Sequence, residues 1–155
     1  MKICLGLLLV AAIGFTACNN NSKDEGHAGH GKEVPKNQED SLMADVMDGH
    51  DAGMAKYGKM QNMEKKVKAT LDSIALLPAK AQQELAPFKA QLDSTAAKLS
   101  YAIFAMDKWM EEFNMDSAKD NTEARIKYLL DEKMKVGKVK EAILNSLQLA
   151  DSLFK

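Results

Sequence analysis

The chain has 155 residues, 46% of them hydrophobic, which suits a single domain plus a tail. Its 21 basic and 22 acidic residues are interspersed and give a formal net charge of -1, so we predict that nucleic acid is not a partner. The two cysteines, Cys4 and Cys18, both lie near the N-terminus, which excludes a domain held by disulfides. No enzyme motif is present, and we predict a non-enzymatic protein.

The first 18 residues have the pattern of a bacterial lipoprotein signal peptide. Lys2 is followed by an apolar run over residues 3–14 that is too short for a stable membrane span. Phe15-Thr16-Ala17-Cys18 resembles a lipoprotein cleavage box. We therefore expect removal of residues 1–17 and lipidation of Cys18, which would anchor the protein to a membrane of the bacterial cell envelope.

Residues 18–40 are predicted to form a flexible tether, because they contain almost no apolar side chain. Ser22-Lys23-Asp24-Glu25 resembles the Lys-acidic export signal of lipoproteins in Bacteroidota-like bacteria, which implies the outer membrane; a solvated charge run is the alternative. His27 and His30 lie in a glycine run and could weakly collect Cu(II) or Zn, or could be incidental to a polar tether.

From residue 41 onward apolar residues recur every three or four positions, which predicts helices. The first predicted helix begins at a cap formed by Asp40 or Ser41 and ends before Pro78. Gly53 and Gly58 each cost it about 1 kcal/mol relative to alanine, which indicates close packing, a kink or simple tolerance. Its apolar or semi-apolar stripe consists of Met43, Val46, Met47, His50, Met54, Tyr57, Met60, Met63, Val67, Leu71 and Ile74.

Two further long helices are predicted. One follows Pro87 after a short helical turn over residues 79–86, and the other runs to the C-terminus, with Asp120 and Glu123 in capping-box spacing at its start. No strand pattern follows the tether, so we predict an all-α, up-down-up three-helix bundle, similar to a coiled coil, over residues 41–155. The stripes are Leu92, Leu99, Ile103, Met106, Met110 and Phe113, and then Ile126, Leu129, Val136, Val139, Ile143, Leu147, Ala150 and Phe154.

Histidine, methionine and the only tryptophan gather at one end of this predicted bundle. If the first hairpin turns near residue 80, residues whose numbers sum to about 160 lie level with one another. His50 is then expected to face Met110, and Met54 to face Met106. The predicted cluster consists of Met47, His50 and Met54 from the first helix and Met106, Trp109 and Met110 from the second.

These donors suggest a soft metal ion. Thioethers and an imidazole select Cu(I), with Ag(I) as a mimic, and an indole face can hold a soft cation. The set resembles in residue type the site of small periplasmic copper chaperones, which are β-barrels, so only the chemistry is comparable. Core packing is the alternative, because methionines fill helical cores and a lone histidine on an apolar face is usually a core or boundary residue with a hydrogen-bond partner, here Asp48 or Asp51.

Three short motifs carry a family resemblance. His50-Asp51-x-x-Met54, Met106-x-x-Trp109-Met110 and Tyr128-Leu129 resemble uncharacterised helical lipoproteins of Bacteroidota-type bacteria, some of which are labelled "viral A-type inclusion protein". The resemblance implies a helical envelope lipoprotein and no particular reaction. Two functions follow as hypotheses: a lipoprotein that binds Cu(I), and a structural or adaptor lipoprotein whose helical faces bind a protein partner or a second copy.

Overall fold

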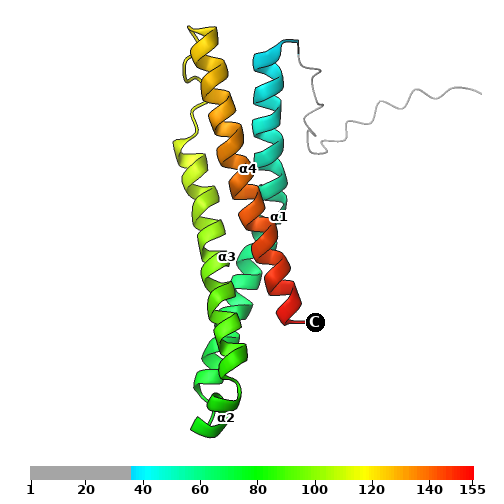
Figure 1. The fold of residues 1–155 in the computed structure, drawn as a ribbon, viewed down its shortest axis with the longest axis vertical. Coiled ribbons are helices and arrows are strands. Elements are labelled where there is room, and N and C mark those ends of the chain that lie inside the picture. Colours follow the sequence, from blue (N-terminus) through cyan, green and yellow to red (C-terminus); the bar gives the residue numbers. More distant parts are fainter. Residues whose placement is uncertain (1–35) are drawn as a thin grey trace, which may run out of the picture. The chain divides into compact units, whose positions relative to one another are not determined.

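The computed structural model describes residues 36–155, which form three long helices and one short one. The three long helices pack side by side, each against the other two, and α3 runs antiparallel to α1 and α4 (Figure 1). The predicted all-α, up-down-up bundle is confirmed. The predictions for Cys18, His27 and His30 lie outside the described residues. In chain order the helices are α1 (Gln38–Ala75), α2 (Ala79–Glu84), α3 (Ala86–Glu112) and α4 (Thr122–Leu153).

Helix α1 begins earlier than predicted. Asn37 has an extended backbone, and its side-chain oxygen accepts a hydrogen bond from the Asp40 N–H at 2.8 Å. The predicted cap at Asp40 or Ser41 is wrong, because both residues lie inside the first turn of α1. In that turn the Asp40 carboxylate is placed favourably with respect to the positive end of the helix dipole. The bundle therefore begins inside the segment predicted as tether.

Helix α4 is capped in the same way. Asn121 is extended, and its side-chain oxygen accepts a hydrogen bond from the Ala124 N–H at 2.9 Å. The cap is thus Asn121, and the predicted capping box of Asp120 and Glu123 is wrong by one position. Asparagine and aspartate are comparable as N-caps, so residue type alone did not distinguish these two neighbours.

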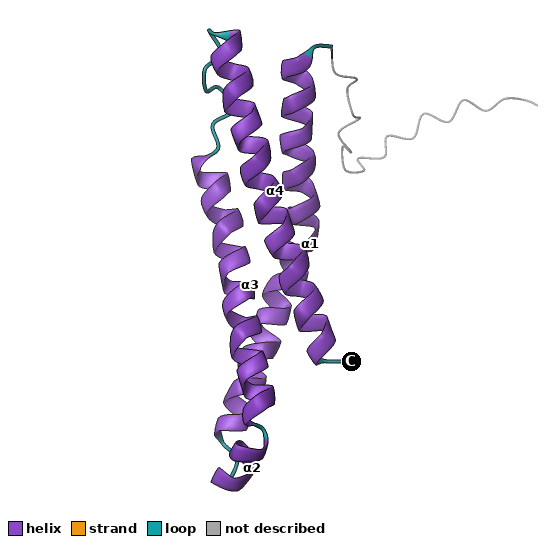
Figure 2. Ribbon diagram, viewed as in Figure 1, coloured by secondary structure: helices purple, strands orange, loops and turns teal. Residues whose placement is uncertain are grey.

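The turn between α1 and α3 follows the prediction closely. Helix α1 ends three residues before Pro78, which precedes the short helix α2 predicted over residues 79–86. Only Leu85 separates α2 from α3, and Pro87 lies in the first turn of α3, where its missing N–H has no helical partner to lose. Figure 2 shows the short loops at this end of the molecule and the longer loop between α3 and α4.

The core runs along the centre of the bundle. Every residue of the three predicted stripes is buried or partly buried, with the exception of Met110, which is 37% exposed. Helix α4 ends before the tip of the α1–α3 hairpin, which extends beyond it with α2 (Figure 1). Near that end Lys59 pairs with Asp151 at 2.7 Å, and Lys66 Nζ lies 4.0 Å from the centre of the Phe154 ring. Among the described helices none is both long and apolar enough to cross a membrane.

Two glycines of α1 allow close packing, Gly49 against α4 and Gly53 against both α3 and α4. A Cβ on Gly49 would lie 2.8 Å from Val136 Cγ1, and a Cβ on Gly53 would overlap Met106 Cε of α3 and lie 3.2 Å from Ile143 Cδ1 of α4. A Cβ on Gly58 would meet nothing within 4 Å. Close packing, a kink and simple tolerance were the three expected explanations for the glycines of this helix. Close packing applies to Gly53, whereas Gly58 is simply tolerated.

Candidate functional site

The two halves of the predicted cluster meet at the expected level of the bundle. The rings of His50 on α1 and Trp109 on α3 have centroids 5.7 Å apart, and Met106 packs against Gly53. Both pairs agree with the predicted register, in which residue numbers sum to about 160. Within that register the His50 ring contacts Trp109, the residue before Met110, and Met106 packs against Gly53, the residue before Met54.

Trp109 is a core residue. It is buried, its ring stacks on Phe113 with centroids 4.9 Å apart, and Phe113 stacks in turn on Tyr128 of α4. The indole Nε1–H donates to Glu132 Oε2 at 2.9 Å. The ring is thus held by His50, Phe113 and Glu132, and its position is fixed by contacts to all three long helices or their ends.

Glu132 is the site residue that the sequence analysis missed. Its side chain is only 5% exposed, and its second oxygen accepts a hydrogen bond from Lys135 Nζ at 2.8 Å. Hydrogen bonds to Asp131 and then Glu132 raise the pKa of Lys135 above its ordinary value. A signal was present: Glu132 falls three residues after Leu129 and four before Val136, which is the spacing of the core stripe.

Met106 and Met110 differ in environment although both flank Trp109. Met106 is fully buried at the centre of the bundle, where it packs against Gly53. Met110 is 37% exposed and lies level with His50 on α3. Only Met110 of the two is therefore open to solvent.

His50 lies at the edge of α1 that faces α3. Its side chain is 22% exposed, and Asp51 Oδ1 accepts a hydrogen bond from its Nδ1 at 2.9 Å, so the expectation that Asp48 or Asp51 orients it is met by Asp51. Met47 and Met54, three residues before and four after, are both partly buried. Residues at these spacings are neighbours on a helix surface, about 5–6 Å apart at Cβ. We call Met47, His50 and Met54, with Met110 level on α3, the His50 cluster.

The same end of the bundle is tied together by a buried arginine. Arg125 is 2% exposed; its Nη1 and Nη2 donate to the carbonyls of Ser117 and Met115, each at 2.8 Å, and its Nε donates to Glu39 at 3.1 Å. One side chain thus joins the α3–α4 loop to the start of α1. In that loop Ala118 has a φ of 58°, an uncommon conformation for a residue with a Cβ.

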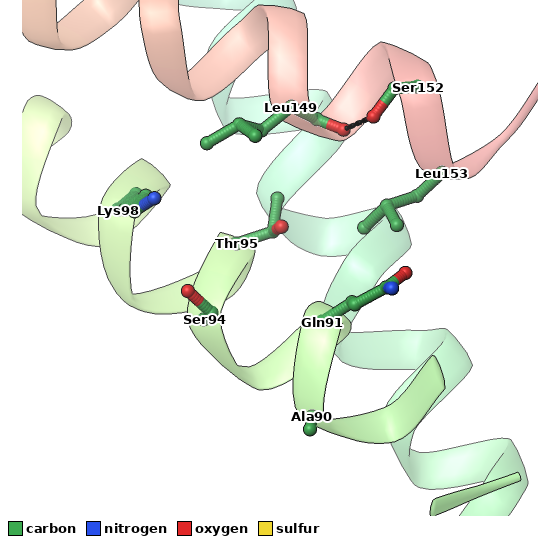
Figure 3. Close-up of a pocket in the computed structure, with 8 residues that line it drawn as sticks. All are labelled: Ala90, Gln91, Ser94, Thr95, Lys98, Leu149, Ser152 and Leu153. Carbon is green, nitrogen blue, oxygen red and sulfur yellow. Dashed lines mark hydrogen bonds between the residues drawn. The ribbon is translucent and has the colours of Figure 1, made fainter. Parts of the chain in front are cut away.

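A shallow groove lies away from the His50 cluster, between α3 and the last turns of α4 (Figure 3). Leu149 and Leu153 project from α4 toward α3, and Ser152 Oγ donates to the Leu149 carbonyl at 2.6 Å. The α3 side is lined by small or polar side chains. None of the predicted ligands contributes to this groove, which is lined by Ala90, Gln91, Ser94, Thr95, Lys98, Leu149, Ser152 and Leu153.

Within residues 36–155 no three His, Cys, Asp or Glu side chains are grouped so that they could hold a metal ion, so any site at His50 depends on thioether donors. Comparison of the chain with protein-family models, with curated proteins and with solved structures finds no match.

Proposed function

We propose that this chain is a lipoprotein of the bacterial cell envelope, anchored through Cys18, that binds Cu(I) at the His50 cluster. The observation that carries the proposal is the placement of His50, which lies partly buried on α1 between the positions of Met47 and Met54, with its Nδ1 held by Asp51. In the neutral imidazole this hydrogen bond leaves Nε2 as the ligand nitrogen. The anchor and the outer-membrane address are inferred from the first 25 residues and from the resemblance to helical lipoproteins.

The donor set fits a soft monovalent ion. Met47 and Met54 would supply thioether sulfurs from the same face of α1, and Met110, exposed at the same level of α3, would supply a third. Soft thioether ligands favour Cu(I), and imidazole is compatible with it. Met106 is fully buried, so we do not include it among the proposed ligands. The Trp109 ring would lie beside the ion and would report its binding by fluorescence.

The tether has a subsidiary place in the proposal. His27 and His30 precede α1 in the chain, and in this proposal the two histidines would collect a metal ion weakly before it reaches the His50 cluster. Their contribution is separable, because they can be omitted without touching the bundle.

The experiment is an anaerobic Cu(I) titration of residues 36–155, which keep the Asn37 cap, against a competing chelator with Trp109 fluorescence as the readout. We expect stoichiometric binding that quenches Trp109 and is lost in His50→Gln and in Met47→Leu/Met54→Leu. The matched control is Met134→Leu, an exposed methionine on the outside of α4 that should bind as the parent does. Equal affinity in all four proteins, or no binding against a mild competitor, would refute the proposal.

A second candidate is an adaptor role, favoured by an aromatic pair on the outer face of α3. Tyr101 and Phe104 are 63% and 60% exposed, and they lie opposite the side of α3 that forms the core. Exposed aromatic residues that adjoin one another are typical of binding surfaces. A photo-crosslinking residue at Phe104 should capture one partner in the cell envelope, whereas the same probe at Asn62, an exposed polar position on α1, should not.

A further inference from the structure

The outer face of α4 carries apolar residues that the bundle does not use. Leu130, Met134 and Leu144 are 45%, 61% and 45% exposed. They are spaced four and ten residues apart, which places them within about 80° of one another on one side of the helix, beside the buried stripe of Leu129, Val136 and Ile143. A shallow depression adjoins Leu130 and Met134 on this face.

Gly137 lies at the midpoint of this face, seven residues from each leucine. A Cβ there would meet nothing within 4 Å, so no contact inside the chain requires glycine, although a glycine in a helix interior is unfavourable relative to alanine. Gly58 is equally open, but the residues seven positions away from it are Asp51 and Lys65. Among the glycines of residues 36–155, only Gly137 combines an open helix surface with leucines seven residues away on both sides.

We propose that this face of α4 binds the same face of a second copy of the chain, antiparallel, with the two helices crossing at Gly137. Residues equally far from Gly137 on opposite sides then lie level, so Leu130 lies against Leu144 of the second copy, and Leu144 against its Leu130. Two glycines at the crossing allow the helix backbones to approach closely. The arrangement is a two-fold contact in which one surface complements itself.

Charge is complementary in the same register. Lys133 lies four residues before Gly137 and Glu141 four residues after it, so each Lys133 is level with Glu141 of the second copy. The Lys133 side chain is 48% exposed while it pairs with Asp45, and Glu141 forms no ion pair with another described residue. In the antiparallel dimer, the Glu141 side chain of each copy is thus level with Lys133 of the other copy.

The size of the face sets the strength of the contact. The segment from Leu130 to Leu144 is about 21 Å long, and a single pair of crossing helices of this length buries less than the roughly 1,600 Å² of a standard interface. The dimer is therefore weak in dilute solution and requires a high local concentration. The proposed dimer contact includes no residue of the His50 cluster, so dimerisation and Cu(I) binding can be tested independently.

The test is crosslinking between single-cysteine variants of the purified full chain, in a Cys4→Ser/Cys18→Ser background. Lys127→Cys and Gln148→Cys, both exposed, lie nearly level across the proposed contact, whereas either residue is about 30 Å from its own copy. With a short thiol crosslinker at hundreds of micromolar protein, a mixture of the two variants should give dimer and each variant alone should not.

The crossing point is tested with a matched pair of substitutions. Gly137→Gln should lower the crosslinked yield at least tenfold because it separates the helices, whereas Gly58→Gln should leave it unchanged. Glutamine favours helix at both sites, so both variants should remain folded by circular dichroism. Three results would overturn the proposal: no crosslinking in the mixture, equal crosslinking of each variant alone, or equal yields for the two glycine variants.

Discussion

The close approach of α1 and α4 at Gly49 predicts that two chemically identical substitutions in one helix have different effects. Gly58→Ala adds a Cβ where there is open space, so it should gain the helix propensity of alanine, about 1 kcal/mol. Gly49→Ala gains the same propensity but places its Cβ 2.8 Å from Val136 Cγ1, about 0.6 Å inside the 3.4 Å of ordinary contact.

Val136 cannot easily move away. It is 1% exposed, and a valine in a helix has one strongly preferred χ1 rotamer. Overpacking of this kind costs about 1–3 kcal/mol, so Gly49→Ala is expected to change the free energy of unfolding by between zero and about -2 kcal/mol. The two variants should therefore differ by roughly 1–3 kcal/mol, with Gly49→Ala the less stable.

Urea unfolding of both variants, followed by circular dichroism, measures this difference. Val136→Ala in the Gly49→Ala background removes the atoms in conflict, so the double variant should be more stable than the sum of the single effects predicts. Strict additivity, or equal stability of Gly49→Ala and Gly58→Ala, would show that the helices can separate at this point without loss, contrary to the packing argument.

Three further predictions concern single contacts. Hydrogen bonds from Lys68 and then Ser100 lower the pKa of Glu64 from its ordinary value of 4.5. The contribution of Glu64 to stability is therefore complete above pH 4.5 and is lost as the pH falls below it. In urea unfolding, Glu64→Gln should reduce the change in the free energy of unfolding between pH 7 and pH 3. Ala118→Gly relieves a φ of 58° and should raise the urea midpoint by the equivalent of about 1 kcal/mol, unlike Ala97→Gly in α3, which should lower it. Trp109→Phe removes the donor to buried Glu132 and should lower the free energy of unfolding by about 1–3 kcal/mol, and an unchanged value would contradict a structural role for that bond.

Periodicity was sufficient for the helices and for their register. The spacing of three and four residues identified every long helix, and the position of the turn near Pro78 placed His50 level with Met110, one residue from the Trp109 ring that it contacts. Both depend on the geometry of the helix, which is the same for all residue types. The predictions of the helix caps were wrong because the cap depends on the backbone conformation of a single residue. Asn121 has an extended backbone and caps α4, whereas its neighbour Asp120 does not cap the helix.

The error at Met110 has a similar origin. From Met106 the core stripe of α3 could continue to Trp109, three residues on, or to Met110, four residues on, and both are apolar. The two positions differ by 100° around the helix, so only the location of the neighbouring helices decides between them. Contact with α4 through Glu132 draws Trp109 inward, and Met110 is left at the exposed edge.

The two edges of α1 have opposite characters, and this explains why the candidate metal site lies where it does. Toward α4 the helix presents Gly49, and Gly53 lies between α3 and α4; neither leaves room for a ligand, because Val136, Ile143 and Met106 fill the space. Toward α3 it presents long polar or polarisable side chains: His50 beside Trp109, and Tyr57, whose hydroxyl donates to Asp107 at 2.6 Å. Thioethers and an imidazole on this edge can bind an ion without opening the glycine contact that holds α1 and α4 together.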